Sequence, residues 1–219
     1  MSLFARLSKV SRQQKLQLFA RLMQPTPAMR VLDLGGETNP GGDRTLQFID
    51  TYAWRDKITA VNLSSAHIAT IQSHYPEIDA RVGDARQLPW PDKYFDVVYS
   101  NAVIEHVGDF ERQRQMAKEV MRVGKRWFVT TPNRWYPYEF HLRLPLVTWL
   151  PGSLYLSAAR MVQYNHVKRC YQFGNAKPTG LRLLDGRQMR TLFPQSRIIK
   201  QRVTFWPETL IAVGGDGVY

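Results

Sequence analysis

Arg30-Val31-Leu32-Asp33-Leu34, followed directly by Gly35-Gly36, is the segment that most clearly predicts the architecture of this chain. A short apolar run that ends in glycine is typical of a buried strand leading into a tight loop. Short apolar runs of this kind recur along the chain, and segments with helical periodicity separate them. The predicted strands are residues 30–34, 58–63, 80–83, 95–100, 126–130, 198–205 and 209–213, and the predicted helices are residues 3–23, 43–54, 65–75, 109–123 and 185–193.

This alternation predicts an α/β fold, in which a mostly parallel sheet is covered by helices on both faces. Right-handed crossovers between the strands give the doubly wound form. Trp206-Pro207-Glu208 is a short connection, so the last two strands should pair as an antiparallel hairpin. The length of 219 residues suits a single domain over residues 1–219.

The composition restricts the class of protein. Lysine and arginine number 30 against 18 acidic residues, a net charge of +12 that favours anionic partners. We expect the five basic residues within residues 1–29 to lie on a solvated helix face. Cys170 is the single cysteine, which excludes an internal disulfide and a multi-cysteine zinc site. With no signal-like or membrane-spanning run, we expect a cytoplasmic protein, and loose contact with an anionic membrane surface stays open.

Residues 132–180 interrupt the strand–helix rhythm and are predicted to form an inserted lid over one edge of the sheet. From residue 151 to 202 there are ten basic residues and one acid, Asp185, which favours an anionic substrate. The same region is rich in rings, which can stack on a ligand or fill the core of the lid. These rings are Trp135, Tyr136, Tyr138, Phe140, Trp149, Tyr155 and Tyr164.

Polar residues and glycines gather where the predicted strands end, and this is where open parallel sheets bind ligands. Gly35 and Gly36 allow the backbone to approach a ligand, and Asp33 can accept hydrogen bonds from an ammonium group. Asn62 ends the second strand, where nucleoside-binding folds contact the ribose. Asp84 ends the third strand and can accept from an adenine amino group.

Three segments in this order resemble the class I S-adenosylmethionine-dependent methyltransferases, most closely the branch that modifies small molecules and sugars. They are Val31-Leu32-Asp33-Leu34-Gly35-Gly36, Gly83-Asp84-Ala85 and Phe95-Asp96-Val97-Val98-Tyr99-Ser100-Asn101-Ala102-Val103-Ile104-Glu105-His106-Val107. The resemblance covers about residues 29–131 and the terminal hairpin. It implies a Rossmann-like sheet of seven strands, mostly parallel, with an antiparallel last strand.

The resemblance also implies S-adenosylmethionine as the cofactor. The loop at Gly35, Gly36 and Glu37 would hold the methionine part, together with Asp33. Asn62 and Leu63 would lie at the ribose and adenine, Asp84 and Ala85 at the adenine, and Asn101 near the sulfonium. Two positions depart from the family pattern: Glu37 stands where a glycine is frequent, and Asn62 stands where an acid is usual.

A base is needed only if the methyl acceptor is a hydroxyl or a protonated amine. His141, beyond the fifth strand, and His106, after the fourth, are the candidates, although His106 can equally pack or cap the following helix. No metal-ligand cluster is apparent in the sequence. We expect O- or N-methylation of a small molecule or of a glycan or lipid-linked intermediate.

Two other classes of function remain open. A basic, aromatic-rich chain can bind or methylate nucleic acid. The sequence disfavours this, because Ser100-Asn101-Ala102-Val103 is not the paired-proline motif of base-amino methyltransferases. A non-catalytic, cofactor-binding homologue is the other alternative, and the departures at Glu37 and Asn62 are its basis.

Overall fold

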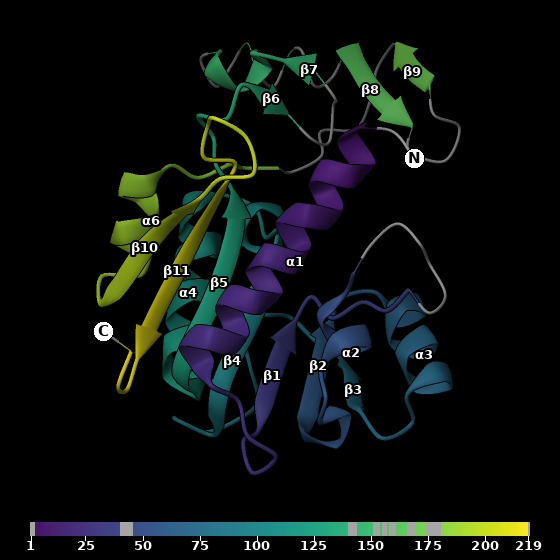
Figure 1. The fold of residues 1–219 in the computed structure, drawn as a ribbon, viewed down its shortest axis with the longest axis vertical. Coiled ribbons are helices and arrows are strands. Elements are labelled where there is room, and N and C mark those ends of the chain that lie inside the picture. Colours follow the sequence, from purple (N-terminus) through teal and green to yellow (C-terminus); the bar gives the residue numbers. More distant parts are fainter. Residues whose placement is uncertain are drawn as a thin grey trace.

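The centre of the molecule is a seven-stranded sheet with the order β10-β11-β5-β4-β1-β2-β3 (Figure 1). The computed structural model describes residues 3–39, 46–139, 144–150, 154, 157, 161–165, 170–173 and 181–218. The strands of the sheet are β1 (Val31–Leu34), β2 (Ile58–Asn62), β3 (Asp79–Val82), β4 (Phe95–Asn101), β5 (Gly124–Pro132), β10 (Ser196–Gln201) and β11 (Thr209–Gly215).

The pairing confirms the predicted fold class. β3, β2, β1, β4 and β5 run parallel, while β11 pairs antiparallel with both β5 and β10. β1 lies between β2 and β4, so the chain winds outward in both directions from β1. This is the point at which a doubly wound sheet opens a crevice at the carboxyl ends of its strands.

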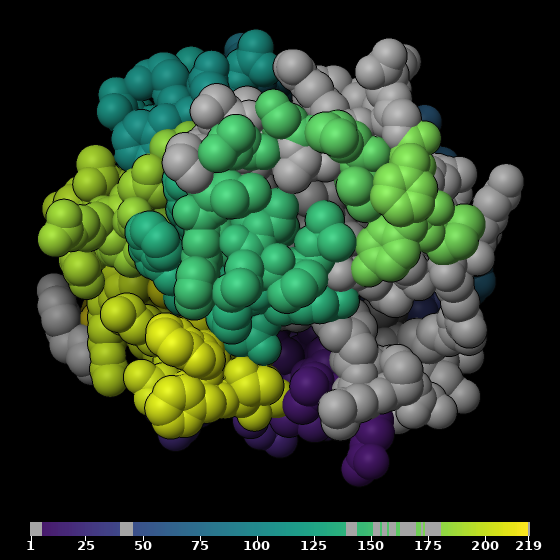
Figure 2. Space-filling model, turned by 90° about the horizontal axis from the view of Figure 1, so that it is seen from above, coloured from purple at the N-terminus to yellow at the C-terminus, as the bar shows by residue number. Residues whose placement is uncertain are grey.

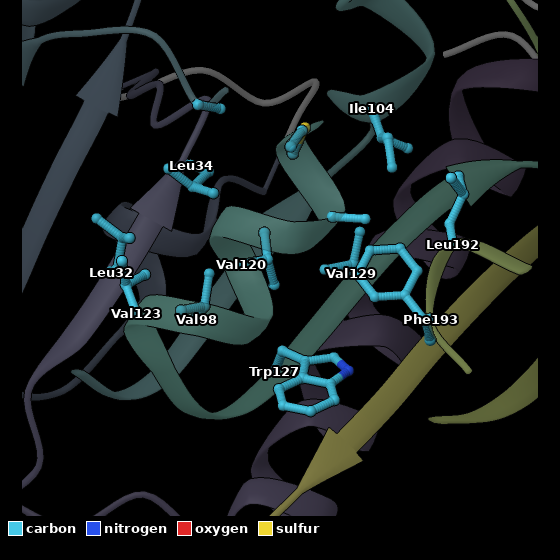
Figure 3. Close-up of a cluster of buried hydrophobic side chains, with 14 of the residues drawn as sticks. Leu32, Leu34, Val98, Ile104, Val120, Val123, Trp127, Val129, Leu192 and Phe193 are labelled. Carbon is cyan, nitrogen blue, oxygen red and sulfur yellow. The ribbon is translucent and has the colours of Figure 1, made fainter. Parts of the chain in front are cut away.

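Helices cover both faces of the sheet because the strand side chains alternate between two apolar cores. On one face, α1 (Leu3–Met23), α2 (Phe48–Thr51) and α3 (Ser65–His74) cover the core that contains Phe19, Val31 and Phe128. On the other, α4 (Phe110–Val123) and α6 (Gly186–Leu192) cover the core that contains Leu32 and Trp127 (Figure 3). Two short turns of helix, η1 (Arg55–Lys57) and η2 (Ile104–His106), follow α2 and β4.

Two predicted elements are shorter in the structure. The helix expected over residues 43–54 is limited to α2 within the described residues, and residues 43–45 lie outside them. The strand expected over residues 198–205 ends at Gln201. The extension to residue 205 was wrong because the pairing with β11 closes at Gln201: the Glu208 N–H donates to the Gln201 carbonyl, so residues 202–207 form the connection. The antiparallel hairpin itself is confirmed, with Gln201 opposite Thr209.

The segment after β5 carries the short elements β6 (Tyr138–Glu139), β7 (Leu144–Pro145), η3 (Val147–Trp149), β8 (Val162–Asn165) and β9 (Cys170–Phe173). β6 pairs with β7 and β8 with β9, both antiparallel, and both pairs lie above the carboxyl ends of the parallel strands (Figure 1). Within the described part of the chain, no helix has both the length and the apolar character to cross a bilayer.

Candidate active site

A cleft of about 670 Å³ opens at the carboxyl ends of the strands on either side of β1. It brings together most of the residues that the sequence singled out. Those that line it are Gly35, Glu37, Asn62, Leu63, Asp84, Ala85, Asn101 and His106. Asp33 lies beside it, in a smaller hollow of about 20 Å³ that shares Gly35, Glu37 and Asn101 with the cleft.

The loop after β1 is held against the neighbouring strand. The N–H groups of Gly35 and Gly36 both donate to the Val61 carbonyl, at 2.7 and 3.3 Å. Gly35 has a φ of +81°, and a Cβ there would lie 2.2 Å from Cγ2 of Val103. Glycine is therefore required at this position, since any side chain would be both strained and in collision with the cleft wall.

The side chain of Asn62 organises the same wall. Its amide nitrogen donates to the Gly36 carbonyl at 2.9 Å, and its oxygen accepts from the Ser64 N–H at 2.9 Å. Ser64 in turn accepts from the His67 N–H and caps α3. Asn62 thus ties the first loop to the start of α3, which an acid could not do because it has no N–H to donate.

Glu37 lines the cleft without filling it. Its side chain is 47% exposed, with one carboxylate oxygen 3.4 Å from Nδ1 of His67 and the other 3.4 Å from the amide nitrogen of Gln47. His67 is also 3.3 Å from the Asn62 amide. The carboxylate of Glu37 therefore stands close to the end of β2, where the sequence has Asn62 in place of an acid.

Asp84 has a partner that the sequence did not reveal. The guanidinium of Arg86 donates to both carboxylate oxygens of Asp84, and the Arg86 N–H donates to one of them at 2.9 Å. These hydrogen bonds hold the pKa of Asp84 below its ordinary value, so this carboxylate is ionised at the end of β3. The sequence signal was the two-residue spacing, which lets Arg86 reach back over the turn.

Asn101 lies at the end of β4 and is fixed by Thr130 on the neighbouring strand. The Thr130 hydroxyl donates to Oδ1 of Asn101 at 2.8 Å. This bond orients the amide so that its nitrogen can donate to a group in the cleft. Ala102 follows with a φ of +58°, and this turn directs the chain along the cleft floor towards η2.

Cations from α1 face the acidic residues of the first loop. Lys15 is 9% exposed, and burial together with the charge of Arg12 lowers its pKa to about 8. Arg12 donates to the side-chain oxygen of Gln47 at 3.0 Å and lines both the cleft and the small hollow. Asp33 faces the same hollow, and burial, followed by the charge of Glu37, raises the pKa of Asp33 to about 8.

The prediction that the basic residues of the first helix lie on a solvated face is therefore wrong for Arg12 and Lys15. The signal was present in the sequence, because Arg12, Lys15, Leu16 and Phe19 follow the i, i+3, i+4, i+7 pattern of one helix face. Phe19 is buried at the sheet, and the face that it shares continues to the cleft.

The two histidine candidates differ in position. His106 lies in η2, is exposed, and lines the cleft. His141 lies outside the described residues, so its place at the cleft stays a prediction. Glu105, next to His106, is buried and accepts from the Thr131 hydroxyl at 3.0 Å. No cluster of three metal-ligating side chains occurs in the described part of the chain.

Residues 37–127 match the family described as methyltransferase domain. A probable S-adenosylmethionine-dependent methyltransferase of Mycolicibacterium smegmatis is 37% identical over 81 residues, which are 36% of this chain and 30% of that protein. The chloroplastic 2-methyl-6-phytyl-1,4-hydroquinone methyltransferase of Arabidopsis thaliana is 32% identical over 100 residues, 45% of this chain and 28% of that protein. The matched segments thus span less than a third of these relatives.

Solved structures share the fold over nearly the whole chain. An amino pentose methyltransferase of Micromonospora echinaspora, determined with S-adenosylmethionine bound, has a TM-score of 0.61 and 15% identity, covering 95% of this chain and 93% of that one. The 1,6-didemethyltoxoflavin-N1-methyltransferase of Burkholderia thailandensis has a TM-score of 0.54 and 14% identity, covering 95% and 80%. At these identities the likeness establishes a shared fold.

Proposed function

We propose that this chain, which has the fold and the domain of the class I S-adenosylmethionine-dependent methyltransferases, is an enzyme that methylates a small molecule. The observation that carries the proposal is the cleft of about 670 Å³, where the ends of β1, β2, β3 and β4 each present a polar or glycine residue. Small-molecule sites have volumes of roughly 300–1,000 Å³.

The chemistry of the cleft fits S-adenosylmethionine, which carries an ammonium, a carboxylate, a ribose, an adenine and a positive sulfonium. Asp33, at the end of β1, is the acid beside the small hollow, and it suits the ammonium group. Arg12 is the cation that lines the cleft beside Gly35, and it suits the carboxylate. Asp84 and Ala85 at the end of β3 suit the adenine amino group and ring.

We assign the ribose hydroxyls to Glu37 in addition to Asn62 and Leu63. The Asn62 side chain is engaged by Gly36 and Ser64, while the carboxylate of Glu37 lies at the same His67 ring. A carboxylate accepts from both ribose hydroxyls, which a single amide oxygen does less strongly. Glu37 would then contact the ribose in place of the acid that the family pattern has at the end of the second strand.

When bound, S-adenosylmethionine would supply a methyl group: the acceptor would attack the methyl carbon in line, and the sulfur would leave as the neutral thioether of S-adenosylhomocysteine. The contribution of this chain is alignment and exclusion of water. Asn101, oriented by Thr130, lies at the floor of the cleft, and α1 covers it on the side of Arg12. His141 and His106 are the candidate bases that could take a proton from a hydroxyl or a protonated amine, and His106 is exposed at the cleft.

The acceptor we propose is a small molecule, or a glycan or lipid-linked intermediate, methylated on oxygen or nitrogen. Support comes from proteins of the same fold or of similar sequence, which include an amino pentose methyltransferase and a hydroquinone methyltransferase. Residues 132–180 are the proposed substrate lid, and the elements described within them, β6 to β9, lie at the carboxyl end of the sheet (Figure 1).

Calorimetric titration with S-adenosylhomocysteine tests the cofactor site without knowledge of the acceptor. The wild-type chain should bind it, and Glu37→Gln and Asp84→Asn should each bind it about tenfold more weakly, a loss of about 1.4 kcal/mol. Asp216→Asn, an exposed acid in the turn at the far end of β11, serves as the control. Absence of binding by the wild-type chain would overturn the proposal.

A further inference from the structure

A large aromatic and basic surface lies at the same end of the molecule as the cleft but outside it. It joins the β10–β11 connection, with Phe205 and Trp206, to the segment after β5, with Trp135 and Trp149. The ring centroids of Trp149 and Trp206 are 6.4 Å apart, and those of Phe205 and Trp206 are 6.2 Å apart. We call these four residues the aromatic surface.

Its side chains are unusually exposed for their type. Phe205 is 87% exposed, Trp135 52% and Trp206 48%. Of the 12 large apolar side chains most exposed in the described part of the chain, nine lie between residues 135 and 206, at this end. A soluble monomer rarely exposes so concentrated an apolar area unless the area binds something.

The surface occupies one face of the molecule. Figure 1 shows the β10–β11 connection and the elements β6 and β7 together above the carboxyl ends of the strands. Figure 2, viewed from above, shows residues 202–208 in yellow directly beside residues 133–139 and 144–150 in teal-green. A hollow of about 370 Å³ lies between them, and its lining includes Trp135, Phe205, Trp206, Lys200 and Arg202.

The charges around the rings are positive. Lys200 and Arg202 are exposed at the hollow, and the guanidinium of Arg134 lies 5.8 Å from the Trp135 ring. Of the nearby acids, Glu208 is buried at 6% exposure, and Asp185 accepts the N-terminal N–H groups of α6. With a net charge of +12 on the whole chain, the partner that this surface fits is anionic, and a second copy of the chain would be repelled.

We propose that the aromatic surface docks the protein on the surface of a bilayer that contains anionic lipids. Tryptophan and phenylalanine rings are favoured at the level of the lipid headgroups, where flanking lysine and arginine meet the negative surface potential. The contact is peripheral, as the described part of the chain has no helix suited to crossing a bilayer. Docking does not depend on methyl transfer. If the docking and the proposed function both hold, the cleft opens beside the membrane, and a lipid-linked acceptor is favoured.

Vesicle co-sedimentation of the full chain is the test. Vesicles of phosphatidylcholine and phosphatidylglycerol in equal parts should bind the protein, and those of phosphatidylcholine alone should bind it at least tenfold more weakly. Lys200→Gln with Arg202→Gln should weaken binding about fivefold for each charge removed, and high salt should act in the same direction. Arg21→Gln with Lys118→Gln removes the same charge at exposed sites on α1 and α4 and should weaken binding much less.

Phe205→Ala with Trp206→Ala should weaken binding to the anionic vesicles by tenfold or more. An unchanged thermal midpoint shows that this variant is folded. Quenching of tryptophan fluorescence by lipids with brominated acyl chains tests the same contact in the wild-type chain, without any substitution, and docking requires it.

The proposal is overturned if the wild-type chain does not bind the anionic vesicles, or if brominated lipids do not quench its fluorescence. It is also overturned if the Lys200/Arg202 pair and the Arg21/Lys118 pair weaken binding equally, because net charge alone would then explain it. A dimer in solution that the Phe205/Trp206 variant abolishes would assign the surface to a second copy instead.

Discussion

At the scale of single residues, the cleft depends on a few positions with specific physical roles. Gly35 is such a position because its backbone is left-handed and Val103 fills the space of a side chain. Asn62 is another, since it both donates and accepts within the first loop. Asp33 is a third: its burial makes the charged form costly until a cation arrives.

Gly35→Ala should destabilise the protein and weaken the cofactor site together. The left-handed backbone alone costs about 1–3 kcal/mol for a residue with a side chain. Displacement of Val103 should also weaken the binding of S-adenosylhomocysteine by about tenfold or more. Urea unfolding and calorimetry measure the two effects. Gly186→Ala is the control, since its Cβ would meet nothing nearer than 3.9 Å; an equal effect of the two substitutions would contradict the prediction.

Asp33 should make the stability depend on pH. Burial raises its pKa from 3.8 to about 8, so in this pH range the folded chain keeps a proton that the unfolded chain has released. The contribution of this proton to the free energy of unfolding is fully present below pH 3.8 and is lost as the pH rises through about 8.

Asp33→Asn should therefore flatten the dependence of the unfolding free energy on pH in that range, by at most about 1.4 kcal/mol for each pH unit. Urea unfolding at a series of pH values measures this. Exposed Asp216→Asn should leave the curve as it is in the wild type. Parallel curves for Asp33→Asn and the wild type would contradict the assignment. Burial lowers the pKa of Lys15 from 10.5 to about 8. Lys15 therefore affects the unfolding free energy at higher pH than Asp33, and there it makes the unfolding free energy rise with pH.

At the scale of elements, α1 has two functions. Its C-terminal half packs Phe19 and Met23 on the sheet, with the Phe19 ring 5.3 Å from Tyr99 and 5.6 Å from Phe128. Its middle brings Arg12 and Lys15 to the hollow beside Asp33. The same helix face is thus apolar where it meets the sheet and cationic where it meets the acidic first loop.

Arg12→Gln should weaken the binding of S-adenosylhomocysteine about tenfold, because Arg12 is the α1 cation that lines the cleft. The substitution keeps a hydrogen-bonding side chain near Gln47, so the thermal midpoint should change little. Arg6→Gln on an exposed part of the same helix is the matched control. If calorimetry gave the same affinity for both variants, Arg12 would have no part in cofactor binding.

At the scale of the whole molecule, one sheet supports two cores, and neighbouring residues of β5 belong to different ones. Trp127 packs under α4 and α6, where its indole N–H donates to Ser196 at 2.8 Å, whereas Phe128 packs under α1. The exposed apolar residues are not distributed around this sheet; they gather at the end that also holds the cleft. Stability and recognition therefore occupy different parts of the molecule.

Phe128→Ala should lower the free energy of unfolding by about 3–5 kcal/mol, because it leaves a cavity in a fully buried core. Phe205→Ala, which removes the same ring from an exposed site, should change it by about 0.5 kcal/mol or less. Urea unfolding of the two variants compares them directly. A comparable loss for Phe205→Ala would mean that its ring supports the fold, and the aromatic surface would lose its basis as a free surface.

The sequence by itself determined the order of the elements, the mostly parallel sheet and the end of the sheet at which the cleft lies. Periodicity and glycine spacing carry this information because they reflect local backbone geometry and which faces are buried. Tertiary structure alone decided that Glu37 stands beside Asn62 and His67, and that the β10–β11 connection joins the segment after β5 in one aromatic surface. These are contacts between side chains of separate segments, and side-chain direction there depends on the packing of the whole chain rather than on local pattern.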